Sequence, residues 1–185
     1  MTVAGLVLAA GAGRRFGGPK ALVELDGERL VDRAVRTLTE GGISTAYVVQ
    51  GAAVLDVPGA QVVDNPGWRE GMGSSLRAGL TALPADVEAV VVVPVDQPGL
   101  TAAAVRRVVI AGQAPRAALV TATYGGRGGH PVLLGRDHWP AVVAVARGDV
   151  GARPVLAAAS GTVVQVECGD VADGADIDTA EDLSR

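Results

Sequence analysis

The chain has 185 residues, a net charge of −4 and a composition that is 49% hydrophobic but only 3% aromatic. The acidic balance argues against a nucleic-acid or anionic-membrane surface, which would need excess basic residues, and no apolar run reaches the roughly 18 residues of a membrane span. The single cysteine, Cys168, excludes an intrachain disulfide and a cysteine-rich metal site. A chain of this length suits one domain, and we expect a single soluble, cytoplasmic domain over residues 1–185.

Apolar runs of strand and helix type alternate along the chain. The strand signals cover 2–10, 44–50, 61–64, 87–95, 117–123 and 162–167, and the helix signals cover 28–40, 72–83, 101–110, 136–146, 151–159 and 179–183. We interpret 125–130 as a loop within an irregular hairpin. The alternation predicts an α/β fold, a three-layer α/β/α sandwich with a Rossmann-like, mostly parallel sheet. Ligands of such sheets bind beyond the carboxyl ends of the strands, so the loops after Leu8, Asp64 and Val95 should converge on one site.

The loop after the first strand, 11–20, combines glycines with cations. Glycines let backbone N–H groups turn toward an anion, while Arg15 can hold phosphate oxygens in a planar fork and Lys20 supplies a compact charge. The two usual phosphate-binding motifs do not fit this loop: the third glycine of a dinucleotide fold is missing from Gly11-x-Gly13-x-x-Phe16, and the P-loop pattern is broken in Gly18-Pro19-Lys20-Ala21. The glycines and cations together still suit a triphosphate. The alternative is a structural turn with solvated arginines.

Two rare residues stand out against the arginine-rich composition. Lys20 is the only lysine and Asn65 the only asparagine, which makes both candidates for positions with their own chemistry. Asp96 follows the most apolar strand, where a carboxylate is costly unless it is hydrated or meets a cation. Mg²⁺ is commonly held by one or two carboxylates with phosphate oxygens and waters, so Asp96 is a candidate ligand; the alternative is a helix cap ahead of Thr101.

Other candidate residues have structural alternatives of similar weight. Ser74 and Ser75 stand at a helix start, where free N–H groups suit a phosphate, but simple N-capping explains one of them. Trp68 is either a lid residue or a packed surface aromatic. Asp178 is either an acidic ligand or a cap of the last helix.

The second half of the chain contains candidates for contact with a second substrate, which would be the acceptor if the site transfers a group from the triphosphate. His130 could orient such an acceptor and Arg127 could meet its anionic group, although a histidine in a glycine loop is often structural. In the segment 148–153, Asp149 is a candidate N-cap. Arg153 either pairs with Asp149, which we favour, or binds the acceptor.

The first loop resembles the Leu-Ala-Ala-Gly-x-x-x-Arg-x-Gly-x-x-Lys pattern of nucleotidyltransferases that act on the molybdenum cofactor. That branch belongs to a larger group with sugar-phosphate and methylerythritol-phosphate cytidylyltransferases. Further matches follow in the family's order: Asn65-Pro66-Gly67-Trp68, Gly71-Met72-Gly73-Ser74-Ser75-Leu76, Asp96-Gln97-Pro98, Gly128-Gly129-His130-Pro131, Gly148-Asp149-x-Gly151-Ala152-Arg153 and Asp176-Ile177-Asp178-Thr179-x-Glu181-Asp182-Leu183. The ordered set spans nearly the entire chain.

This resemblance implies the roles of the site residues. Arg15, Lys20 and Asp96 would be catalytic, with Mg²⁺ held by Asp96 and Asp178, and the backbone of 9–11 would face the base. The nucleotide-binding set would be Leu8, Ala9, Ala10, Gly11, Gly13, Arg15, Lys20, Asn65, Gly73, Ser74 and Ser75, and the acceptor-binding set Gln97, Arg127, His130 and Arg153. Relatives that use GTP tend to have glycine at the position of Ala10, so its methyl group favours CTP, an effect of about 1 to 3 kcal/mol.

The implied reaction transfers CMP from CTP to a small phosphorylated acceptor, molybdopterin or molybdenum cofactor, and releases pyrophosphate. The acceptor phosphate is itself the nucleophile, which explains the lack of a serine, cysteine or histidine triad. The alternatives are a sugar-phosphate acceptor, a guanylyltransferase, or an inactive nucleotide-binding accessory protein serving a molybdoenzyme or its chaperone. We expect a monomer or a weak homodimer.

Overall fold

Seven strands form one sheet in the computed structural model, which describes residues 2–184. In spatial order they are β5 (Ala60–Asp64), β4 (Ala46–Gln50), β1 (Val3–Leu8), β6 (Ala89–Pro94), β8 (Arg127–Gly135), β7 (Leu119–Tyr124) and β9 (Val164–Glu167). Neighbouring strands are parallel except that β8 runs antiparallel to both β6 and β7. The predicted mostly parallel sheet is therefore confirmed.

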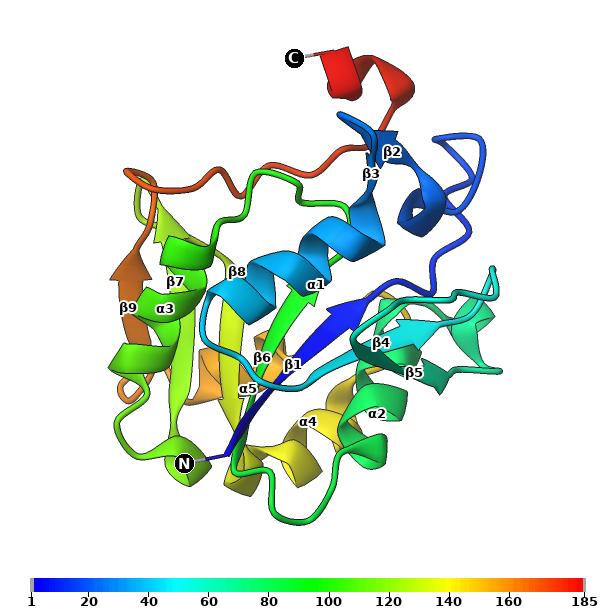
Figure 1. Cartoon of the computed structure of the whole chain (residues 1–185). Helices are drawn as coiled ribbons and strands as arrows, with labels where there is room; N and C mark the ends of the chain where they lie inside the picture. The colour runs from blue at the N-terminus through cyan, green and yellow to red at the C-terminus, as the bar shows by residue number, and fades with distance from the viewer. Residues whose placement is uncertain (1, 185) are drawn as a thin grey trace.

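Helices cover both faces of this sheet, which confirms the three-layer sandwich (Figure 1). On one face lie α1 (Leu30–Glu40) and α3 (Ala102–Ala111), and on the other lie α2 (Met72–Ala82), α4 (Trp139–Val145) and α5 (Arg153–Ala158). A separate two-stranded sheet pairs β2 (Glu24–Leu25) with β3 (Glu28–Arg29). Between residues 2 and 184, no helix has the length and apolar character to cross a membrane.

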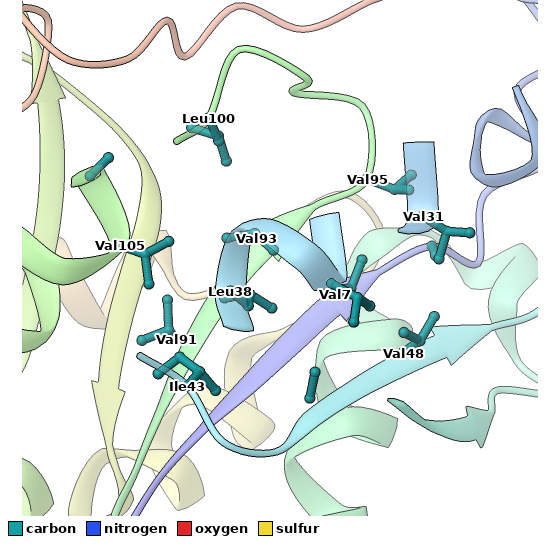
Figure 2. Packing of buried hydrophobic residues seen from close by; sticks show 14 of the residues in the cluster. Val7, Val31, Leu38, Ile43, Val48, Val91, Val93, Val95, Leu100 and Val105 are labelled. Carbon is teal, nitrogen blue, oxygen red and sulfur yellow. The ribbon is translucent and has the colours of Figure 1, made fainter. Parts of the chain in front are cut away.

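The core consists of aliphatic side chains that alternate across the sheet. Along β1, Val7 packs toward α1 and α3, whereas Leu6 and Leu8 pack toward α2, as the period of two in a strand requires. Figure 2 shows Leu38 of α1 and Val105 of α3 facing the strand residues. Burying each such side chain stabilises the fold by about 1.5 to 3 kcal/mol, so both faces of the sheet hold helices firmly. Cys168 is fully buried in the core on the α1 and α3 side of the sheet.

The hairpin of β7 and β8 differs from the sequence-based prediction. The loop predicted over 125–130 is limited to a tight turn in which Gly125 and Gly126 both have positive φ, and β8 already begins at Arg127. A register shift between Thr121 and Ala122 supplies the irregularity. The glycines of this segment have no side-chain pattern, so nothing in the sequence indicates the strand.

The predicted helix boundaries shift where local turns intervene. The helix predicted from residue 28 begins at Leu30, because Glu28 and Arg29 pair in β3. The helix predicted over 136–146 is divided into a 3-10 turn, Arg136–His138, and α4. The last helix is a 3-10 turn, Ala180–Ser184. Further 3-10 turns are Lys20–Leu22, Trp68–Glu70 and Pro115–Ala117.

The topology brings several loop starts to one edge of the sheet. Leu8 at the end of β1 pairs with Val49 of β4 and Pro94 of β6, so the loops after these strands leave the sheet together. Because β8 is antiparallel to β6, its first residues lie at the same edge. This edge is where the candidate site lies.

Candidate active site

A cleft of about 480 Å³ lies beyond the carboxyl ends of β1 and β6. Its walls come from the first loop, the segment after β5, the end of β6 and the C-terminal segment. The lining residues are Leu8, Ala10, Gly11, Ala12, Gly13, Arg14, Arg15, Phe16, Lys20, Trp68, Arg69, Gly71, Met72, Ser75, Pro94, Val95, Asp96, Asp149 and Asp178. The loops after β1, β5 and β6 therefore converge on one site.

The first loop folds back on itself around Gly13. The carbonyl oxygen of Gly13 accepts hydrogen bonds from the backbone N–H groups of Phe16, Gly17 and Gly18. Gly13 has φ +56°, and a Cβ atom there would lie 1.9 Å from the carbonyl oxygen of Gly18. No other residue fits this turn without rearrangement, and the turn returns Lys20 to the end of β6.

Lys20 joins two carboxylates from distant parts of the chain. Its Nζ donates to Asp96 Oδ2 at 2.9 Å and to Asp178 Oδ1 at 3.3 Å. Arg15 approaches the same oxygen of Asp178, with its Nη2 at 3.8 Å. The Lys20 side chain is only 14% exposed, against 27% for Asp96 and 50% for Asp178. Burial alone would lower the pKa of Lys20, but the hydrogen bonds and charges of the two carboxylates raise it, so the ammonium stays charged at neutral pH.

Other residues cap the helices next to Asp96 and Asp178. Thr101 is the residue that caps α3, accepting a hydrogen bond from the N–H of Ala104. At the C-terminal turn, the Asp182 carboxylate accepts the N–H groups of Asp178 and Thr179. The two carboxylates that meet Lys20 are therefore free to face the cleft.

The donor set fits a magnesium ion that is shared with a nucleotide. Oxygens of Asp96 and Asp178 already converge on one cation, the Lys20 ammonium, and hard carboxylate oxygens are the ligands that Mg²⁺ prefers. Within residues 2–184, no group of three or more His, Cys, Asp or Glu side chains could hold a metal. A metal here would need phosphate oxygens to complete its coordination, which is the usual arrangement for Mg²⁺.

Asn65 lies behind the cleft wall, not in the cleft. It is 5% exposed, and its Nδ2 donates to the hydroxyl oxygens of Ser74 at 2.9 Å and Ser75 at 3.1 Å. Its Oδ1 accepts the N–H of Gly67 at 3.0 Å. The Ser74 hydroxyl in turn contacts the carbonyl oxygens of Gly67 and Gly71. Asn65 therefore ties the segment after β5 to the start of α2.

This network predicts a measurable stability effect. We expect Asn65→Ala to lower the free energy of unfolding by about 2 kcal/mol, because it removes the buried partner of the Gly67 N–H and of the Ser74 and Ser75 hydroxyls. Urea unfolding measures the change. The exposed β5 residue Gln61 provides the control, since Gln61→Ala should change stability by less than about 0.5 kcal/mol. Equal effects of the two substitutions would contradict the assigned role of Asn65.

The nucleotide-binding residues implied by the resemblance divide into two groups. Leu8, Ala10, Gly11, Gly13, Arg15, Lys20 and Ser75 line the cleft, whereas Ala9, Asn65, Gly73 and Ser74 do not. Ala9 packs with the core on the α1 side of the sheet. Gly73 lies against the segment after α4, with its N–H donating to the carbonyl oxygen of Gly148 at 2.8 Å. These four positions shape the cleft from behind.

The predicted acceptor residues lie at the same sheet edge but outside the cleft lining. Gln97 Nε2 donates to Asp176 Oδ1 at 2.6 Å, and Arg127 is exposed beside the β7–β8 turn. The carbonyl oxygen of His130 accepts the hydroxyl of Tyr124 at 2.6 Å. The charges of Asp176, Asp96 and Arg153 all act on the His130 ring.

Burial lowers the pKa of His130, although the negative charges of Asp176 and Asp96 oppose the shift. The folded protein thus keeps His130 neutral where an unfolded chain, with a pKa of about 6.5, binds a proton. Stability should therefore fall as the pH drops below about 6.5, by at most about 1.4 kcal/mol per pH unit from this residue. Urea unfolding at pH 7.5 and 5.5 measures the slope, which His130→Gln should reduce. An unchanged slope in that variant would contradict the assignment.

The structure contradicts the predicted role of Asp149 and adds Arg69, which was not predicted, to the site. Asp149 lines the cleft rather than capping a helix, because α5 begins only at Arg153. Among residues 2–184, no ion pair joins Asp149 to Arg153, so the pairing favoured from the sequence is wrong. Arg69 also lines the cleft. The signal that the sequence offers for it is its position directly after Trp68.

Comparison with known proteins agrees with this geometry. The family model described as "MobA-like NTP transferase domain" matches residues 5–163. The chain belongs to this family of nucleotidyltransferases. It is 36% identical to a nicotine blue oxidoreductase from Paenarthrobacter nicotinovorans, with 99% of this chain and 95% of that protein covered. It is 33% identical to a molybdenum cofactor guanylyltransferase from Rhodobacter capsulatus, with 100% and 95% covered.

A solved structure has the same architecture. The homologue of Mycobacterium tuberculosis Rv0371c from Mycobacterium sp. strain JC1 superimposes with a TM-score of 0.82 at 27% identity, covering 99% of this chain and 93% of that one. The resemblance first inferred from the motifs is therefore confirmed for the family and for the fold.

Proposed function

We propose that the chain transfers a nucleoside monophosphate, CMP from CTP, to a small phosphorylated acceptor of the molybdopterin or molybdenum cofactor type, and releases pyrophosphate. The observation that carries the proposal is the contact of Lys20 with Asp96 and Asp178 in a cleft bordered by a glycine-rich loop. The proposal is supported by the meeting of cationic groups and carboxylates in one cleft, since a triphosphate with its metal requires both. It needs no protein nucleophile.

The reaction follows from the charges that the cleft presents. An acceptor phosphate oxygen attacks the α-phosphorus of the nucleotide, forming a new P–O bond, and the bond from that phosphorus to the β-phosphate oxygen breaks. Lys20 and Arg15 bind and neutralise the phosphates as negative charge moves onto pyrophosphate. Asp96 and Asp178 would hold Mg²⁺, which when bound neutralises and aligns phosphate oxygens. Positioning of the two substrates by the first loop supplies much of the rate.

The preference for CTP is supported by the space around Ala10. Ala10 is 4% exposed and lines the cleft beside the first loop, so its methyl group narrows the space available to a base. The relative named as a guanylyltransferase shares 33% identity, and GTP is therefore the competing donor. A methyl group changes such preferences by about 1 to 3 kcal/mol.

A thermal-shift comparison of CTP, GTP, ATP and UTP, each with and without Mg²⁺, tests donor binding. A ligand at 100 times its Kd adds about 2.7 kcal/mol to the stability of the folded state. We expect the largest shift with CTP and Mg²⁺, and a smaller one after chelation with EDTA. A larger shift with GTP would overturn the base assignment, and no shift with any nucleotide would contradict the transferase proposal.

A second candidate function is suggested by the relative named nicotine blue oxidoreductase, which shares 36% identity over nearly the whole chain. In that case the same loop would hold the diphosphate of a reduced dinucleotide, which would give a hydride to an oxidised aromatic substrate. Phe16 stands where dinucleotide-binding loops have their third glycine, so we place this function second. Tight NADH or NADPH binding with no shift by any nucleoside triphosphate would reverse that order.

A further inference from the structure

The segment after β5 presents two flat groups to the cleft that the proposed reaction does not use. Trp68 and Arg69 both line the cleft, and the Arg69 guanidinium carbon lies 4.4 Å from the centroid of the Trp68 ring. Trp68 is half-buried and Arg69 is exposed. An indole stacked with a guanidinium stabilises the exposed position only modestly, so structure alone does not require this pair.

The pair adjoins the first loop through Gly51, the residue after β4. A Cβ atom on Gly51 would lie 2.5 Å from Trp68 Cβ and 2.9 Å from Ala10 Cβ, so the missing side chain lets Trp68 settle against Ala10. The N–H of Ala52 donates to the carbonyl oxygen of Ala10 at 3.0 Å, which fixes the same junction. Trp68 and Ala10 thus form adjoining parts of one cleft wall.

The Asn65 network holds this wall in place. The backbone N–H of Trp68 donates to the carbonyl oxygen of Asn65 at 3.2 Å. The Asn65 side chain forms hydrogen bonds with Gly67 and with the two serines at the start of α2. The short turn Trp68–Glu70 is therefore anchored at both ends. A wall fixed in this way can receive a ligand without first being ordered.

We propose that the nucleobase packs against the Trp68–Arg69 pair, with Trp68 a base-contacting residue and Asn65 a positioning residue. The inference rests on the proposed function, because it requires a nucleotide in this cleft. Phosphates held near Lys20 leave the rest of the cleft to the base, and planar bases stack well on aromatic and guanidinium groups. Because any base can stack, the Trp68–Arg69 pair contributes to the affinity for the nucleotide. The space beside Ala10 determines which base is preferred.

Calorimetric titration with CTP and Mg²⁺, run beside tryptophan fluorescence, tests the proposal. The chain has two tryptophans, and Trp139 is 5% exposed with its Nε1 hydrogen-bonded to the carbonyl oxygen of Leu134. We expect CTP to change the emission of the wild type but not that of Trp68→Phe. Trp68→Ala should weaken the Kd by about 10-fold or more, while Trp68→Phe should stay within about 3-fold because it keeps a ring.

The controls separate this inference from the function on which it rests. Arg69→Ala should weaken CTP binding, whereas Arg116→Ala, which removes a surface ion pair with Asp137, should not. Circular dichroism and thermal melting verify that each variant folds. Heat of CTP binding without any change in Trp68 emission, or an unchanged Kd in Trp68→Ala, overturns the inference and leaves the proposed function standing. No heat with any nucleotide overturns both.

The role of Asn65 has its own readout. If Asn65 only stabilises the fold, Asn65→Ala will bind CTP with the wild-type Kd at a temperature where it is fully folded. If it positions the wall, we expect a weaker Kd for CTP together with altered Trp68 emission in the protein without nucleotide. Wild-type affinity and emission in that folded variant would contradict the positioning role.

Discussion

Replacing Asp96 with asparagine is expected to reduce kcat for nucleotide transfer by about 10³-fold. The carboxylate lies at the end of β6, 2.9 Å from Lys20 Nζ and only partly exposed. Asparagine keeps the shape but removes the charge, and loss of one preorganised electrostatic contact in a catalytic site typically costs about 10²- to 10³-fold. Loss of a metal ligand adds to this cost. Pyrophosphate release under saturating CTP measures the change.

The same substitution should leave the fold intact. Lys20 keeps Asp178 as a partner in Asp96→Asn, so we expect the free energy of unfolding to change by about 1 kcal/mol. Asp137→Asn is the matched control, because Asp137 pairs with Arg116 beyond the opposite ends of the strands. Near-normal turnover in folded Asp96→Asn would remove this residue from the mechanism.

Substitution of Lys20 should lower the catalytic efficiency and at the same time strengthen the binding of a divalent cation. Lys20→Met keeps the length of the side chain but removes the charge that faces the phosphates, and we expect kcat/KM to fall by about 10²- to 10³-fold. Without nucleotide, the ammonium also occupies the point where Asp96 and Asp178 meet. Its removal leaves two carboxylates facing each other, which favours a divalent cation there.

Manganese binding to the protein without nucleotide measures the second effect independently of turnover. We expect electron paramagnetic resonance titration to show tighter Mn²⁺ binding in Lys20→Met than in the wild type, by at least about 10-fold, because repulsion between like charges about 4 Å apart costs about 1 kcal/mol per pair of unit charges even at the dielectric constant of water. The double variant Lys20→Met with Asp96→Asn should lose that gain. Equal Mn²⁺ affinity in wild type and Lys20→Met would show that Lys20 does not compete with a metal.

The sequence predicts the main charged partners because their local signals are strong. The sole lysine follows a glycine loop, and Asp96 follows the most apolar strand; strand order in a parallel sheet then places both at one edge. Their 2.9 Å contact in the structure agrees with this reasoning. For Asp178, the sequence left a choice between ligand and cap. In the structure Asp182 accepts the N–H of Asp178, and Asp178 itself contacts Lys20, so its role as a metal ligand stays a prediction.

Other features depend on contacts that no local pattern contains. Asn65 and Ser74 belong to a motif that suggests ligand contact, yet both are buried against each other, because a motif does not separate residues that touch a ligand from those that shape the wall. Asp149 reads as an N-cap, but α5 starts later in the chain. The strand β8 is hidden by its glycines, and its pairing depends on β6 and β7.

Pyrophosphate release from CTP tests the central claim most directly. The wild-type protein would be mixed with CTP and Mg²⁺ and offered, in turn, molybdopterin, molybdenum cofactor, methylerythritol phosphate and sugar phosphates. We expect release that requires both Mg²⁺ and a phosphorylated acceptor, and that is lost in Asp96→Asn and Lys20→Met. Nucleotide binding with no pyrophosphate from any donor and acceptor pair would contradict the transferase account.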